Sequence, residues 1–258
     1  MHRGERSFVT RLLAIDTAGP ILGVALLQDG IIHHTADKTG PLRHVEQIVP
    51  RIDNALSRLG WTTGDLTSVA VSAGPGSFTG LRVGMAAAKA IALAHDVPLI
   101  SVDTLEALAA TEQHLRGTEK APPTDLIVPV TDARKSRFYT ACFANTPELP
   151  RLTEDADVTR EELLPIIQRL RSPETRRWCA PGPMDQMVRE EPGYVAAVAH
   201  PVSAAPGAAL RGYVKMLHGA ADTQYQGPFY LRPGDIGKAG STPRFAPIYD
   251  SERSEESD

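Results

Sequence analysis

The sequence is poor in cysteine, in aromatic residues and in long apolar runs. It has two cysteines, Cys142 and Cys179, in 258 residues, and neither belongs to a C-x-x-C pair. This excludes a small disulfide framework and favours a reduced compartment. Residues 1–10 are polar and lack the apolar segment of a secretory signal. Lys89 interrupts the longest apolar stretch, 86–94, which is far shorter than the roughly 20 residues of a membrane span. We therefore expect a cytoplasmic protein with no membrane contact.

A surplus of positive charge is also missing. The 27 lysine and arginine residues are outnumbered by 31 aspartate and glutamate residues, which gives a formal net charge of −4. The acidic residues within 250–258 account for that charge, so the rest of the chain is close to neutral. Bulk charge therefore does not indicate a broad basic face for nucleic acid. The acidic, serine-containing end is typical of disordered segments, and we predict a disordered tail over 236–258.

One glycine-rich stretch organises the chain. The apolar run 66–71 predicts a buried strand, 81–94 predicts an alanine-rich helix, and a glycine-rich loop joins them. This motif loop consists of Gly74, Pro75, Gly76, Ser77, Phe78, Thr79 and Gly80. It is neither a G-x-G-x-x-G nor a Walker sequence. A strand, a glycine loop and a helix N-terminus can bind an anion, but the same pattern also forms a tight turn into a closely packed helix. The spacing alone leaves both interpretations open.

The first half has the element order of a ribonuclease H-like domain. A meander of three strands precedes alternating helices and strands, as the apolar periodicity and the Asp29-Gly30 turn indicate. The expected strands are 12–15, 21–27, 31–35, 66–71 and 97–102, and the expected helices are 42–59, 81–94 and 104–115.

The second half repeats the opening of the first. An apolar run ending in Thr131-Asp132 is followed by a short turn and a strand, just as the strand ending in Asp16-Thr17 is. Two such halves resemble the actin, Hsp70 and sugar-kinase (ASKHA) superfamily. We therefore predict an α/β fold of two ribonuclease H-like halves, the second smaller. The expected divisions are an N-terminal extension 1–11, a first half 12–116, a linker 117–124 and a second half 125–235.

In that superfamily ATP lies between the halves, and the resemblance implies a nucleotide site marked by Asp16, Thr17 and Asp132. Such a site needs backbone N–H groups that reach the phosphates and a carboxylate that holds the metal. Here the first turn contains Gly19 followed by Pro20, which has no N–H, and the second turn has no glycine. We interpret the three residues as a vestigial nucleotide site and both aspartates as structural turn caps.

Several short motifs together resemble the bacterial TsaB (YeaZ) family. They are Leu13-Ala14-Ile15-Asp16-Thr17, His44-Val45-Glu46 with Pro50, the stretch from Gly74 to Gly84, Asp132-Ala133-Arg134 and Tyr230-Leu231-Arg232. The resemblance runs from about residue 12 to residue 232, and the glycine stretch is its most specific part. It implies a subunit that is not catalytic by itself but is required for threonylcarbamoyl transfer to an adenosine of tRNA (t6A synthesis).

The resemblance also implies the partners. TsaB pairs with its paralogue TsaD, which transfers the threonylcarbamoyl group, and TsaE is the associated ATPase. It implies no cofactor for the lone chain, a nucleotide at most at an interface shared with the partner, tRNA contact mainly through the complex, and a homodimer as an alternative state. TsaD carries a His-x-x-x-His metal pair just after the next strand, whereas 102–108 contains no histidine here. We therefore expect neither catalytic residues nor a metal site in this chain.

Small residues allow two helices to approach closely, so we predict that the helices 42–59 and 81–94 form the partner interface. The predicted interface residues are His44, Val45, Ile48, Arg82, Met85, Ala86 and Lys89.

Two other functions stay open. One is an ATP-dependent phosphotransferase of the same superfamily, with Asp16 as the metal-linked carboxylate. The other is a peptidase, for which the sequence offers little: it has no His-Glu-x-x-His and no Gly-x-Ser-x-Gly motif. Ser77 stands at a predicted helix start, where a serine is more often a cap than a nucleophile.

Overall fold

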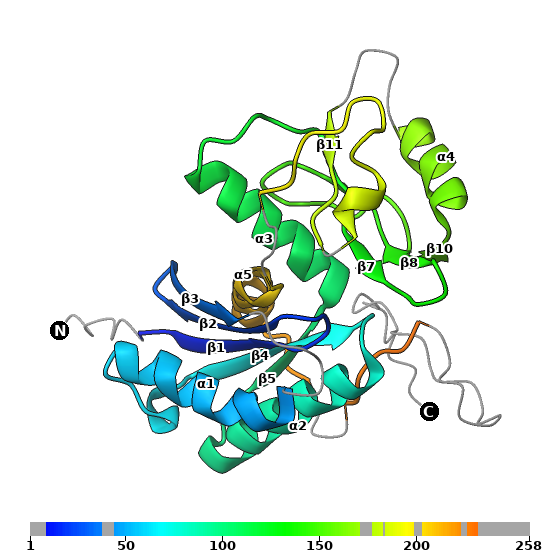
Figure 1. Ribbon diagram of the computed structural model, residues 1–258. Coiled ribbons are helices and arrows are strands. Elements are labelled where there is room, and N and C mark those ends of the chain that lie inside the picture. Colours follow the sequence, from blue (N-terminus) through cyan, green and yellow to red (C-terminus); the bar gives the residue numbers. More distant parts are fainter. Residues whose placement is uncertain are drawn as a thin grey trace, which may run out of the picture.

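The computed structural model describes residues 9–37, 44–170, 177–182, 184–198, 203–222 and 226–231. Most of the predicted N-terminal extension and the whole predicted tail, 236–258, lie outside these residues. Figure 1 shows two α/β halves, with the N-terminal half below the other in this view.

The first half is built on a five-stranded sheet with the order β3-β2-β1-β4-β5. Its strands are β1 (Arg11–Asp16), β2 (Leu22–Gln28), β3 (Ile31–Asp37), β4 (Ser68–Gly74) and β5 (Leu99–Asp103). The first three strands are antiparallel, whereas β4 pairs parallel with β1 and β5 parallel with β4. Nearly all residues of β1 and all those of β4 are buried, as expected for central strands that are covered on both faces and consist mainly of apolar and small residues.

Helices cover both faces of this sheet (Figure 1). One face shares its core with α1 (His44–Arg58) and α2 (Phe78–His95), and the other with α3 (Thr104–Thr118) and α5 (Ala205–Leu217). A single 3-10 turn, η2 (Thr63–Asp65), precedes β4. The helix predicted over 42–59 is confirmed in its described part. α2 begins earlier than the predicted residue 81, because the Ser77 side chain caps it by accepting a hydrogen bond from the N–H of Gly80.

The second half is a smaller sheet in two pieces, with the strand orders β10-β8-β7 and β11-β6-β9. Its elements are β6 (Leu126–Ile127), β7 (Val130–Asp132), β8 (Phe138–Thr140), β9 (Phe143–Ala144), β10 (Ala156–Val158), α4 (Arg160–Leu170), β11 (Trp178–Cys179) and η3 (Asp185–Met187). Together, the consecutive strands β6 and β7 correspond to β1 of the first sheet. The consecutive strands β8 and β9 correspond in the same way to β2. The predicted repeat is confirmed at the level of topology, and the protein has the expected actin-like ASKHA α/β fold.

Helix α5 lies in the segment predicted for the second half, yet it packs against the first sheet and α3. Two glycines permit this close contact. A Cβ on Gly207 would lie 1.8 Å from the carbonyl oxygen of Ala107, and a Cβ on Gly212 would lie 2.7 Å from the Cβ of Ala70. The chain therefore returns to the first half after completing the second sheet, while the predicted domain boundaries stay a prediction.

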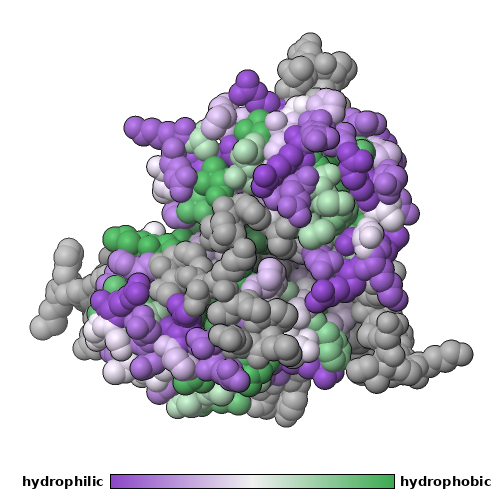
Figure 2. All heavy atoms as spheres, viewed as in Figure 1, coloured by the Kyte–Doolittle hydropathy of each residue, from purple (hydrophilic) through white to green (hydrophobic). Residues whose placement is uncertain are grey.

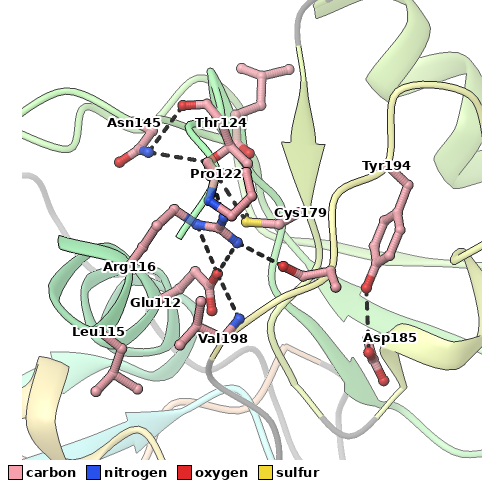
Figure 3. Close-up of polar contacts among 12 residues, drawn as sticks. Glu112, Leu115, Arg116, Pro122, Thr124, Asn145, Cys179, Asp185, Tyr194 and Val198 are labelled. Carbon is pink, nitrogen blue, oxygen red and sulfur yellow. Dashed lines mark hydrogen bonds and ion pairs between the residues drawn. The ribbon is translucent and has the colours of Figure 1, made fainter. Parts of the chain in front are cut away.

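A buried ion pair ties α3 to the connections between the halves (Figure 3). Glu112 and Arg116 lie one turn apart on α3, both are buried, and Arg116 Nε donates to Glu112 Oε1 at 3.1 Å. Arg116 also donates to the carbonyl oxygens of Pro122 and Ala196, at 2.6 and 2.9 Å. The N–H of Val198 donates to the carboxylate of Glu112 at 3.0 Å. α3 is thus fixed both to the chain entering the second half and to the chain leaving it.

Candidate functional site

Asp16 at the end of β1 is buried, and its carboxylate accepts hydrogen bonds from two backbone N–H groups. Oδ1 accepts from the N–H of Ala18 at 3.1 Å, and Oδ2 accepts from the N–H of Ala204 at 2.7 Å. Burial raises the pKa of this carboxyl, and the two hydrogen bonds oppose the rise. Because Ala204 immediately precedes α5, Asp16 fastens the start of that helix to the first sheet. These contacts are those of a structural cap.

Thr17 and Ala18 lie against the start of α2, where three glycines follow at intervals of four residues. A Cβ on Gly76 would lie 2.6 Å from the carbonyl oxygen of Ala18, and one on Gly80 would lie 2.0 Å from that of Thr17. A Cβ on Gly84 would lie 2.2 Å from Thr17 Oγ1, the hydroxyl that donates to the carbonyl oxygen of Gly80 at 2.7 Å. Because the motif glycines have no Cβ, the turn after β1 can pack directly against the backbone at the start of α2. The tight-turn interpretation accounts for them without a bound anion.

The first motif glycine, Gly74, makes room for a segment from the far end of the chain. Its φ is +124°, and a Cβ there would lie 2.1 Å from the carbonyl oxygen of Phe229. The N–H of Phe229 donates to the carbonyl oxygen of Ala73 at 2.6 Å. Residues 226–231, which we call the C-terminal strap, thus lie against the motif loop. Nothing in the spacing of the sequence pairs these two segments; the one local signal is the aromatic composition of the strap.

Asp132, at the end of β7, makes the corresponding turn in the second half. Its Oδ1 accepts from the N–H of Arg134 at 2.7 Å, and its Oδ2 lies 3.4 Å from Arg134 Nη1. Arg134, Lys135 and Ser136 have φ of +65°, +54° and +57°, a left-handed conformation that non-glycine residues rarely adopt. The aspartate stabilises this strained turn, which supports the turn-cap interpretation. A vestigial nucleotide role of Asp16, Thr17 and Asp132 stays a prediction.

The seven predicted interface residues divide by burial. Val45, Arg82 and Ala86 are exposed and Lys89 is half-buried, whereas His44, Ile48 and Met85 are buried within the chain. Burial lowers the pKa of His44, and the neighbouring charge of Asp16 partly opposes that shift. The three buried residues cannot contact a partner directly; they can only position the exposed residues of α1 and α2. The interface role of all seven stays a prediction.

An apolar surface lies over α1 and α2, which pack side by side on one face of the sheet. This α1–α2 face comprises the exposed residues Val45, Val49, Ala86, Ala90 and Leu93, with the basic Arg82 and Lys89 on α2. Three of its large side chains are more than half exposed: Val45 at 60%, Val49 at 67% and Leu93 at 65%. Figure 2 shows apolar side chains along the lower edge of this view, over α1 and α2. Such clustering is typical of a surface that another protein covers.

The segment that would carry a metal pair in TsaD has structural contacts here. Asp103 Oδ1 accepts from the N–H of Glu106 and caps α3 at 2.7 Å, and Thr104 Oγ1 accepts from the N–H of Gly74 at 3.1 Å. Within the described ranges, no three side chains of His, Cys, Asp or Glu gather in a way that could hold a metal ion. In the same part of the chain, no helix combines the length and the apolar composition needed to cross a membrane.

Comparison with known proteins agrees with these features. The family model described as "TsaD: tRNA N6-adenosine threonylcarbamoyltransferase" matches residues 34–171, just over half of the chain. The "tRNA threonylcarbamoyladenosine biosynthesis protein TsaB" of Bacillus subtilis is 34% identical over 132 residues, which cover 51% of this chain and 54% of the relative. The protein of the same name from Escherichia coli is 34% identical over 131 residues, with the same coverage of 51% and 54%. The chain thus spans about half the length of the curated relatives it matches.

A solved structure shares the fold over a longer stretch. The structure titled "YeaZ from Pseudomonas aeruginosa" superimposes with a TM-score of 0.69 at 24% identity, covering 86% of this chain and 100% of that chain. The likeness in fold therefore extends over both halves, beyond the span of the curated matches. From the motifs, the family model and the curated matches together, we conclude that the chain belongs to the TsaB (YeaZ) family.

Proposed function

We propose that this chain is a non-catalytic partner subunit required for threonylcarbamoyl transfer to an adenosine of tRNA. It pairs with the catalytic subunit TsaD and acts together with the ATPase TsaE. The observation that carries the proposal is the α1–α2 face, where large apolar side chains of two adjacent helices are exposed. The curated relatives, named for threonylcarbamoyladenosine biosynthesis, supply the process.

The α1–α2 face fits a helical partner. Ala86 and Ala90 are one turn apart on α2, so two small side chains leave the backbone of that helix open to close approach. Val45, Val49 and Leu93 supply larger apolar groups around them. A specific interface buries about 1,200–2,000 Å² in total, which requires the equivalent helices of TsaD to cover most of this surface. When TsaD is absent, a second copy of the chain covers the same face.

The use of the polar groups supports a non-catalytic role. Asp16, the residue that a phosphotransferase of this superfamily would use, is buried and caps α5. Ser77, the residue a peptidase would use, caps α2. The lone chain therefore takes no cofactor, and a nucleotide binds only at an interface shared with TsaD. tRNA contacts are made mainly through the complex.

Reconstitution tests this function. Purified TsaD, TsaE, tRNA and threonylcarbamoyl adenylate are combined with and without this chain, and modified adenosine is measured by mass spectrometry. We expect modification only when the chain is present. Full modification in its absence would overturn the proposal.

A surface variant tests the role of the α1–α2 face in the same assay. Ala86→Arg places a long charged side chain on α2, so it should abolish co-purification with TsaD and the modification that depends on it. Gln168→Arg adds the same charge on the exposed face of α4 and should behave as the wild type. Unfolding curves of both variants show whether the isolated fold is intact.

A further inference from the structure

Arg82 is exposed on α2, yet contacts from both neighbouring and distant residues hold its side chain. Its guanidinium carbon lies 3.8 Å from the ring centroid of Phe78, one turn earlier on the helix. Its Nε donates to the hydroxyl oxygen of Tyr230 at 3.1 Å, across 148 residues of sequence. An arginine at the protein surface ordinarily samples many rotamers, whereas a stacked and hydrogen-bonded guanidinium is restricted to few.

The C-terminal strap makes this arrangement. The ring of Tyr230 packs on that of Phe78 with 5.0 Å between their centroids. The preceding residue, Phe229, is tied to β4 through the carbonyl oxygen of Ala73, and Gly74 leaves the space that its backbone needs. The motif loop and the strap together position Arg82. The glycine turn and the cap of α2 can form without these contacts to Arg82.

The contacts engage only part of the guanidinium. Stacking uses one face, and Tyr230 uses Nε, but neither Nη1 nor Nη2 has a hydrogen-bond partner within the described part of the chain. The two terminal groups of an arginine form a planar fork that matches the two oxygens of a carboxylate or phosphate. A fork that is held in place before binding loses less conformational entropy when it binds.

The surroundings of Arg82 favour a protein carboxylate over a nucleic acid. Arg82 lies one turn from Ala86 on the exposed side of α2, at the edge of the apolar α1–α2 face, where Lys89 is the other basic residue. The neighbouring α1 carries charges of both signs: the acidic Glu46 and Asp53 and the basic Arg58 are exposed, and Arg51 is half-buried. A nucleic-acid site needs basic groups that follow a phosphate backbone, whereas the described charges of α1 and α2 are of both signs and surround an apolar centre.

We propose that Arg82, positioned by Phe78 and Tyr230, binds an aspartate or glutamate carboxylate of the protein that covers the α1–α2 face. This inference rests on the proposed function, since it names the chemistry by which the same face recognises its partner. The two terminal N–H groups donate to the two carboxylate oxygens. Tyr230 is a positioning residue that acts through Arg82.

The test measures the Kd of the full-length chain for TsaD by calorimetry at several salt concentrations. Arg82→Gln should weaken binding about tenfold or more and reduce its salt dependence, because it removes charge-assisted hydrogen bonds. Arg82→Lys keeps the charge without the fork and should still weaken binding several-fold. Tyr230→Phe keeps the ring and should weaken binding a few-fold through Arg82. Arg169→Gln, on the exposed surface of α4, is the matched control and should bind as the wild type.

The outcomes separate this inference from the proposed function. If the wild type and both Arg82 variants bind TsaD equally well while Ala86→Arg does not, the carboxylate contact is wrong and the proposed function stands. If the wild type does not bind TsaD, both are wrong. If Arg82→Gln binds TsaD normally and the complex loses affinity for tRNA, the anion is a phosphate and the inference is overturned. Binding restored to Arg82→Glu by reversing one carboxylate of TsaD to arginine would support it directly.

Discussion

The carboxylate of Asp16 and the backbone N–H of Ala204 form a 2.7 Å hydrogen bond between residues 188 positions apart. The bond joins the end of β1 to the residue before α5, so the last described helix is attached at the centre of the first sheet. The neighbouring Ser203 lies so close to β2 that a Cβ on Gly23 would be 1.8 Å from its Oγ. The resemblance to the ASKHA superfamily associates an aspartate at this position with a metal. In this structure, Asp16 instead joins β1 to the start of α5.

Removing this acceptor should destabilise the protein. Asp16→Ala leaves the N–H of Ala204 buried without its partner, which costs about 1–3 kcal/mol of the free energy of unfolding. Asp16→Asn retains an oxygen that can accept the bond and should cost less. Urea denaturation at neutral pH measures both. Equal stability of Asp16→Ala and the wild type would show that the bond does not stabilise the fold.

The second prediction concerns the effect of a motif glycine on stability. Gly80→Ala should destabilise the protein by about 1–3 kcal/mol or more, because its Cβ would lie 2.0 Å from the backbone oxygen of Thr17, which cannot move as a side chain could. Gly117→Ala is the matched control: it is also in a helix, and its Cβ would have nothing within 4 Å. It should stabilise the protein by about 0.5–1 kcal/mol, since alanine favours helix over glycine. Thermal unfolding compares the two, and a harmless Gly80→Ala would contradict the close approach.

The same glycines show which parts of the fold can be predicted from the sequence alone. Apolar periodicity and the Asp29-Gly30 turn predict the strand meander and the helices, because local backbone preferences decide those elements. A glycine run between a strand and a helix predicts that something approaches the backbone closely, but not what. The turn at Thr17 and the strap at Phe229 are distant in sequence, so only tertiary packing decides that they, and not a phosphate, occupy this space.

Helix α5 illustrates a related limit. Its place in the chain lies within the segment 125–235, which is predicted to form the second half. The partners of its glycines, Ala107 and Ala70, both lie in the first half. Placement of a helix on one of two similar sheets depends on such individual contacts, which no periodic pattern encodes. Likewise, helical spacing places His44 and Ile48 in a predicted interface, whereas their burial beneath α1 follows from how that helix is rotated on the sheet.

The buried pair on α3 makes a third prediction. Arg116→Met should destabilise the protein by about 3–5 kcal/mol, since it leaves the carboxylate of Glu112 buried without its counter-charge. The double variant Glu112→Leu/Arg116→Met removes both charges and should be more stable than Arg116→Met alone. Chemical denaturation of the two variants provides the comparison. A double variant that is less stable than the single one would mean that losing the hydrogen bond from the Val198 N–H to Glu112 costs more than removing the unpaired charge gains.

The pH dependence of stability provides the last prediction, at a contact between the two halves. Arg151 lies on the second half, and its Nη2 is 2.8 Å from Asp103 Oδ1 at the end of β5, while its Nη1 pairs with Asp155. Burial and the charge of Asp155 raise the pKa of Asp103 to about 7, although Arg151 opposes the rise.

A carboxyl whose pKa is higher in the folded state than its ordinary 3.8 keeps its proton longer when folded than when unfolded. The contribution of Asp103 to stability is therefore largest in acid and declines as pH rises from about 4 to about 7. Asp103→Asn removes this titration, so the free energy of unfolding of the variant, measured at pH 5, 6, 7 and 8, should depend less steeply on pH than that of the wild type. In Asp155→Asn, the free energy of unfolding should still decline with pH, but the decline should end at a lower pH. The reason is that the substitution removes a negative charge that raises the pKa of Asp103. Identical pH profiles for all three proteins would show that this cluster is not coupled to folding through a proton.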